Sequence, residues 1–97
     1  MPLPTPYAYI VCLDLKTPTG NYAPLYAALQ GSFRWFHYIS ATWIVLRYES
    51  LSELQGLLVP LIFTDDRMLI LPAKGPPGGW LPKEAWDWIR QNVPNAW

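Results

Sequence analysis

Two kinds of hydrophobic periodicity alternate along this chain, and their order limits the possible folds more than any other feature. Short runs rich in β-branched and aromatic residues predict strands, and apolar residues spaced at i, i+3, i+4 and i+7 predict helices. The expected strands are residues 7–15, 33–39, 42–48 and 68–71. The expected helices are residues 22–30, 50–58 and 81–93. The chain therefore predicts a β-α-β-β-α-β order followed by one more helix.

Local signals indicate where the second helix begins and ends. Ser50 and Glu53 have the spacing of a capping box, in which each side chain accepts a hydrogen bond from the other residue's backbone N–H. Pro60 predicts an end or a kink near Leu58, because proline lacks the N–H that a continuing helix needs. The expected buried stripe of this helix consists of leucines: Leu51, Leu54, Leu57, Leu58 and Leu61.

The order of elements is that of the ferredoxin-like split βαβ arrangement. We therefore expect an α+β, ferredoxin-like sandwich in a single domain over residues 1–97, with a C-terminal helical extension at about residues 80–94. With the strands numbered along the chain, the expected sheet order is 4-1-3-2, with two helices on one face.

Apolar residues occupy both faces of two predicted strands. A sheet covered on one face normally alternates apolar with polar residues, but residues 7–13 and 43–46 are apolar at every position. Only 14% of the residues are charged, where about 25% is usual, and the chain holds six tryptophans, a residue enriched in interfaces. The second face needs a cover, which is either a second copy, the C-terminal helix, or both. We expect a homodimer.

Composition also excludes several classes of protein. The seven basic and seven acidic residues balance, so the lone domain lacks the basic stripe that drives general nucleic-acid binding. A single cysteine excludes an internal disulfide. Residues 1–6 contain no basic residue and do not resemble a signal peptide. The longest uncharged run, residues 17–33, contains glycines and prolines and is not a membrane span. We expect a cytoplasmic protein without a membrane partner.

Four stretches resemble the CRISPR-associated protein-two superfamily, and within it the SinR-like stand-alone branch, which is related to virulence-associated protein D. They are YIVCLDL (9–15), HYISATWIV (37–45), DDRMLIL (65–71) and GWLPKEAWDWI (79–89). The resemblance implies a ferredoxin-like homodimer. In nuclease members the aspartate that ends the first strand holds a divalent metal near the dimer axis, and Asp14 is the matching residue. Leu13 stands where tyrosine is common, and Lys16 is the one basic residue of a loop that often carries several arginines.

Asp14 is therefore the candidate catalytic and metal-binding residue. We expect the end of strand 7–15 to lie beside the start of an antiparallel strand 68–71 and the end of a parallel strand 42–48. This would gather the following charged residues along one edge: Asp14, Arg47, Glu49, Asp65, Asp66 and Arg67. Carboxylates suit Mg²⁺ or Mn²⁺, which activate water in phosphoryl transfer. The alternative is that Asp14 caps the following loop while the other acids pair with the two arginines.

The remaining candidates have weaker signals. Nucleic-acid contacts would come from basic residues: Lys16, Arg34, Arg47 and Arg67. Cys12 and His37 could form a thiol–imidazole pair, but the expected topology separates their strands, and structural roles are favoured. One cysteine and one histidine cannot make a zinc site. Packing or an interface, rather than base stacking, is expected for the C-terminal tryptophans: Trp80, Trp86, Trp88 and Trp97.

Two functions from different classes follow. One is a homodimeric, metal-dependent nuclease acting on RNA or DNA. The other is a non-catalytic dimer of the same fold that serves as a scaffold or partner-binding module, which the zero net charge favours.

Overall fold

The structure, a computed structural model, describes residues 5–93. Its elements are β1 (Tyr7–Asp14), α1 (Ala23–Gln30), β2 (Arg34–Ile39), β3 (Thr42–Arg47), α2 (Leu51–Leu58), the 3₁₀ turn η1 (Val59–Leu61), β4 (Arg67–Pro72) and α3 (Lys83–Asn92). The predicted β-α-β-β-α-β order with an added C-terminal helix is confirmed, and the fold is an α+β, ferredoxin-like arrangement. No helix among residues 5–93 is long and apolar enough to cross a membrane.

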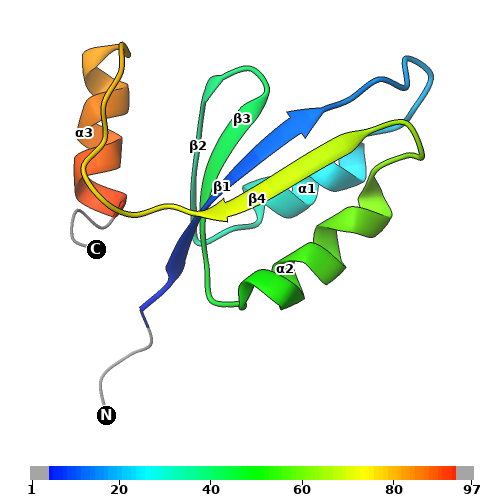
Figure 1. The fold of residues 1–97 in the computed structure, drawn as a ribbon, viewed down its shortest axis with the longest axis horizontal. Coiled ribbons are helices and arrows are strands. Elements are labelled where there is room, and N and C mark those ends of the chain that lie inside the picture. Colours follow the sequence, from blue (N-terminus) through cyan, green and yellow to red (C-terminus); the bar gives the residue numbers. More distant parts are fainter. Residues whose placement is uncertain (1–4, 94–97) are drawn as a thin grey trace.

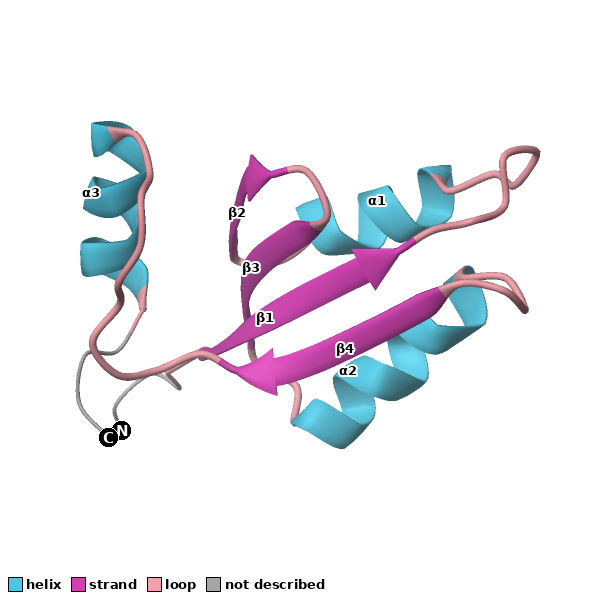
Figure 2. Cartoon of the chain, turned by 45° about the horizontal axis from the view of Figure 1, so that its top comes forward, coloured by secondary structure: helices cyan, strands magenta, loops and turns pink. Residues whose placement is uncertain are grey.

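The four strands form one antiparallel sheet in the order β2-β3-β1-β4, which confirms the predicted order 4-1-3-2. Helices α1 and α2 lie on the same face of this sheet, and α3 stands beside β2 (Figures 1 and 2). The main core fills the space between the sheet and α1 and α2, and its buried residues are Tyr9, Val11, Leu13, Leu25, Leu29, Trp43, Val45, Leu54 and Leu58.

Helix α2 begins and ends where the sequence predicts. Ser50 and Glu53 form both hydrogen bonds of the capping box, and the helix ends at Leu58, before the 3₁₀ turn that contains Pro60. The predicted leucine stripe is too wide, however. Leu54 and Leu58 are fully buried, whereas Leu51 and Leu57 are exposed, because α2 contacts the sheet through this i, i+4 pair and leaves its flanks in solvent.

The second face of the sheet is half covered by the chain itself. Phe36 of β2 is buried against Ala85 and Ile89 of α3, and the Phe36 and Trp88 ring centroids are 5.4 Å apart. A small cluster of Ala8, Leu46 and Ala73 continues this covering. The C-terminal helix therefore covers its own sheet over β2 and β3.

The other half of the second face carries no covering element among the described residues. It is formed by β1 and β4, and we call it the open β1–β4 face, made of Ile10, Cys12, Leu69 and Leu71. Register places Ile10 opposite Leu71 and Cys12 opposite Leu69. Leu69 is 54% exposed and Leu71 is 45% exposed. An apolar surface this open normally marks a contact with another molecule.

Candidate functional site

Asp14 ends β1 at the rim of the open β1–β4 face. Its side chain is exposed, and its Oδ2 lies 3.4 Å from Nζ of Lys16. In the register of the sheet its partner is Arg67, the first residue of β4. Asp14, Arg67, Cys12 and Leu69 line a shallow depression at this end of the sheet. Within residues 5–93, Lys16 is the one ion-pair partner of Asp14, so the carboxylate is accessible and weakly held.

The expectation that Arg47 and Glu49 join Asp14 is wrong. Strand β3 is antiparallel to β1, and Arg47 lies opposite Tyr7, at the far end of β1 from Asp14. The cause is the tight turn between β2 and β3. The crossover through α1 makes β2 run in the direction of β1, and the hairpin then reverses the chain, so that β3 runs against both.

Asp66 lies near the Asp14 end of the sheet, but its carboxylate already accepts hydrogen bonds from other parts of the chain. Its buried carboxylate accepts hydrogen bonds from the backbone N–H of Lys16 at 2.7 Å and of Phe63 at 2.9 Å. It also accepts from the hydroxyls of Tyr22 at 2.9 Å and Thr17 at 3.3 Å. The carboxylate thus joins the loop after β1 to the turn before β4. Its neighbour Asp65 is exposed.

Two opposing effects act on the pKa of Asp66. Burial of the carboxylate raises the pKa, but the amides of Lys16 and Phe63 and the hydroxyls of Tyr22 and Thr17 together outweigh burial, so the pKa lies below its usual value. The charged form of Asp66 is therefore more stable in the folded state than in the unfolded state. The contribution of this carboxylate to the stability of the fold is fully present above the ordinary carboxyl pKa, and it is lost as pH falls through the lowered pKa.

Asp66→Asn is therefore expected to lower the melting temperature at neutral pH and to weaken the dependence of stability on acid pH. The asparagine side chain has one oxygen that accepts hydrogen bonds, where the carboxylate of Asp66 has two, and it does not titrate. Melting from about pH 7 to about pH 2 measures both effects. Asp65→Asn is the matched control and should melt like the wild type. If the wild type and Asp66→Asn lost the same amount of stability as pH falls, the role assigned to Asp66 would be wrong.

A Mg²⁺ or Mn²⁺ site does not fit within one chain. Among the described residues, no group of three His, Cys, Asp or Glu side chains is placed to hold a metal. Asp14 offers one exposed carboxylate, and the oxygens of Asp66 are already satisfied by protein donors. Both cations prefer several oxygen ligands, with waters completing the shell for Mg²⁺. The expected edge of carboxylates is therefore reduced to the exposed Asp14 and Asp65.

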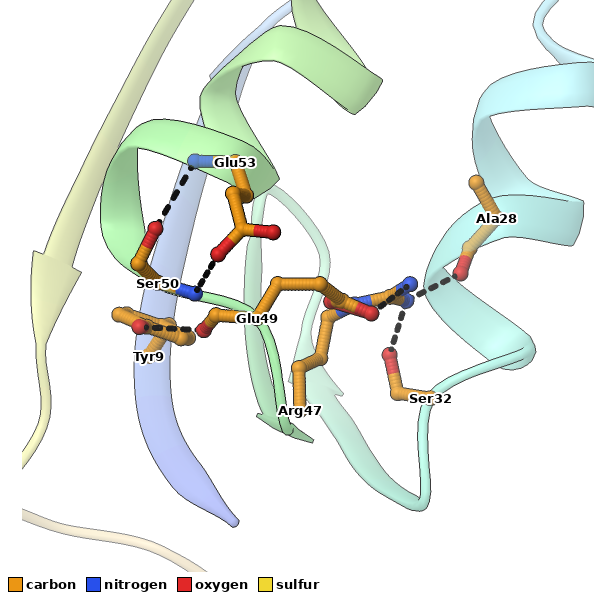
Figure 3. Close-up of polar contacts among 7 residues, drawn as sticks. All are labelled: Tyr9, Ala28, Ser32, Arg47, Glu49, Ser50 and Glu53. Atoms are coloured by element: carbon orange, nitrogen blue, oxygen red, sulfur yellow. Dashed lines mark hydrogen bonds and ion pairs between the residues drawn. The ribbon is translucent and has the colours of Figure 1, made fainter.

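Arg47 has a structural position at the opposite end of the sheet (Figure 3). Its side chain is only 11% exposed, and its Nε donates to Oε2 of Glu49 at 2.6 Å. Nη1 donates to the carbonyl oxygen of Ala28 and to Oγ of Ser32, both at 2.9 Å. The hydrogen bond from Arg47, aided by its charge, outweighs partial burial and lowers the pKa of Glu49. The guanidinium thus joins β3 to the end of α1.

The four basic residues proposed as nucleic-acid contacts do not form one patch. Lys16 and Arg67 lie at the Asp14 end of the sheet. Arg34 and Arg47 lie at the other end, where Arg34 sits 5.3 Å from the centroid of the Phe33 ring.

Cys12 and His37 lie on different faces of the sheet. Cys12 is half-buried on the open β1–β4 face, while the His37 ring stacks on Trp43 of the main core with centroids 3.9 Å apart. His37 Nε2 is 3.0 Å from the carbonyl oxygen of Ser40. Strand β3 separates the two strands that carry them. This placement supports structural roles for both.

The C-terminal tryptophans have different environments. Trp86 and Trp88 pack against the cluster of Phe36, Ala85 and Ile89, as expected for packing residues. Trp80 is 98% exposed, and Trp97 lies outside the described residues.

The fold places the chain among α+β proteins of ferredoxin-like arrangement. No family model matches the chain, and comparison with curated proteins and with solved structures gives no match.

Proposed function

We propose that the chain functions as a homodimeric binding module, a scaffold of the CRISPR-associated protein-two-like type that has no nuclease activity of its own. The observation that carries this proposal is the open β1–β4 face. It presents Leu69 and Leu71 to solvent beside the half-buried Ile10 and Cys12, on a strand pair at the edge of the sheet.

The energetics of this surface favour a contact with another protein chain. Fully burying a fully exposed leucine side chain is worth about 1.5–3 kcal/mol, so covering the half-exposed Leu69 and Leu71 is worth a part of that for each. No charged side chain belongs to the open β1–β4 face, and Asp14 and Arg67 lie at its end. A surface with an apolar centre and a charged rim has the composition of a protein interface.

The charged groups support a non-catalytic role. Asp14 is paired with Lys16, Asp66 is satisfied by four protein donors, and Arg47 is engaged by Glu49 and α1. Few charged side chains are therefore left free on one surface to bind a phosphate backbone or a metal. Binding to RNA or DNA would need several basic residues on one surface.

A second candidate function is a metal-dependent nuclease acting on RNA or DNA, centred on Asp14. The observation that favours it is the accessibility of the Asp14 carboxylate at the rim of the open β1–β4 face, beside Arg67. Since one chain does not supply a set of ligands for Mg²⁺ or Mn²⁺, this function requires that two copies bring their Asp14 residues together.

Asp14→Asn separates these two functions. For the binding module, wild type and variant both fail to cleave RNA or DNA with Mg²⁺ or Mn²⁺. The variant should also unfold within about 1 kcal/mol of the wild type, because an exposed ion pair contributes little. Cleavage assays and thermal melting measure the two effects. The control is Asp87→Asn, which removes an exposed carboxylate paired with Lys83 and Arg90 on α3.

Wild-type cleavage that depends on Mn²⁺, persists in Asp87→Asn and disappears in Asp14→Asn would refute the non-catalytic role and establish the nuclease.

A further inference from the structure

We infer that a second copy of this chain joins at the outer edge of β4, by antiparallel pairing of β4 with the partner's β4. The inference rests on the proposed homodimer and names the surface that forms it.

The edge formed by β2 is protected and the edge formed by β4 is not. Strand β2 has an irregular register between Phe36 and Ile39, and α3 stands beside it (Figures 1 and 2). Bulges and covering helices are the usual means by which proteins prevent pairing at a sheet edge. Strand β4 pairs regularly with β1 from Arg67 to Pro72, and among residues 5–93 no strand lies on its other side.

The hydrogen-bonding groups on the free edge of β4 follow from the register. The N–H of Ala73 donates to the carbonyl oxygen of Ala8 at 2.8 Å, and Ala8 is the next position in the β1–β4 ladder after Tyr9 and Pro72. In an antiparallel pair, successive residues alternate between bonding to one neighbour and facing away from it. Met68 and Ile70 therefore direct an N–H and a carbonyl group outward, and Pro72 directs a carbonyl alone.

The side chains around this edge are mostly apolar above and below it. Two residues of α2, one of η1 and three of β4 form a groove along the edge, which we call the edge groove: Leu51, Gln55, Val59, Met68, Leu69 and Ile70. Leu51 and Val59 are exposed there. On the opposite face, Leu69 and Leu71 continue to the open β1–β4 face. A strand added to β4 needs mainly apolar side chains on both of its faces to match these surfaces.

Strand β4 itself has that pattern. Met68 and Ile70 pack towards the main core, and Leu69 and Leu71 point to the open β1–β4 face. A two-fold axis perpendicular to the sheet keeps each face on its own side, so that the partner's Ile70 enters the edge groove and the partner's Leu69 lies near Leu69. Arg67 then faces the apolar end of the partner strand, and no like charges meet.

This arrangement is incompatible with a shared metal between two Asp14 residues. Asp14 lies on β1, so two β4 strands would separate it from the partner's Asp14. Three strand spacings amount to about 14 Å, whereas metal–oxygen bonds are about 2.0–2.6 Å long. Edge pairing therefore joins the two open β1–β4 faces into one surface and keeps the two carboxylates apart.

Charge substitution at Leu69 tests the inference. The wild type should have a mass in light scattering of about twice the chain's 11.1 kDa at micromolar concentration. Leu69→Lys and Leu69→Glu should each be monomeric, since like charges would meet across the axis. An equimolar mixture of the two should recover a dimer containing one copy of each. Leu57→Lys, at an exposed leucine of α2 outside the edge groove, should remain dimeric.

Hydrogen exchange at the amides of Met68 and Ile70 identifies the surface independently. Edge pairing predicts that both amides exchange slowly in the wild type and in Leu57→Lys, and rapidly in Leu69→Lys. A monomeric wild type would overturn both the proposed homodimer and this inference. A wild-type dimer in which both amides exchange rapidly, or which survives Leu69→Lys, would overturn the edge pairing and leave the homodimer standing.

Discussion

Leu54→Ala is expected to lower the free energy of unfolding by about 2–4 kcal/mol, because it leaves a cavity where α2 meets the sheet. Leu54 is fully buried in the main core with Leu58, Val11 and Val45. Thermal or denaturant unfolding measures the loss. Leu57→Ala makes the same chemical change on the exposed side of the same helix and should cost less than about 0.5 kcal/mol. Equal losses in the two variants would mean that α2 contacts the sheet through a different face.

Arg47→Ala is expected to cost about 2–3 kcal/mol, a loss close to that of a core leucine. It removes charge-assisted bonds to Glu49 and the bonds to Ala28 and Ser32, and it leaves a half-buried carboxylate without its partner. Arg47→Lys should retain only a part of the stability that Arg47→Ala loses, because an ammonium group cannot reach all three acceptors in the guanidinium geometry.

The matched control for Arg47 is Arg34→Ala, which removes an exposed arginine from the neighbouring strand and should change stability by less than about 0.5 kcal/mol. Denaturant unfolding compares the three variants. If Arg47→Ala proved as mild as Arg34→Ala, then Arg47 would not be the link between β3 and α1.

Features set by neighbouring residues were predictable from the sequence. The capping box of Ser50 and Glu53 is a local exchange of hydrogen bonds, and Pro60 ends α2 through its missing N–H. The sheet order followed from the succession of elements, because connections between strands and helices have strong topological preferences. The need for a cover on the second face followed from apolar residues on both sides of β1, and α3 supplies half of it.

The candidate site was less predictable because it depends on contacts between distant segments. The assumed parallel direction of β3 placed Arg47 and Glu49 beside Asp14, whereas the β2–β3 hairpin takes them to the other end. Asp66 could not be distinguished from Asp65 by residue type. Its role comes from the backbone amide of Lys16, 50 positions away, and the charged pair before β4 was the one signal that pointed to it.

The protection of a single edge of the sheet sets a limit to growth. A sheet with two free edges can add copies at both ends and extend into a filament. The irregular register of β2 and the neighbouring α3 close one edge, so the proposed pairing through β4 would use up the one free edge that residues 5–93 of each copy present. Growth by strand pairing would then stop at two chains. By the same reasoning, the proposed dimer would become an open-ended polymer only if β2 lost both α3 from beside it and its irregular register.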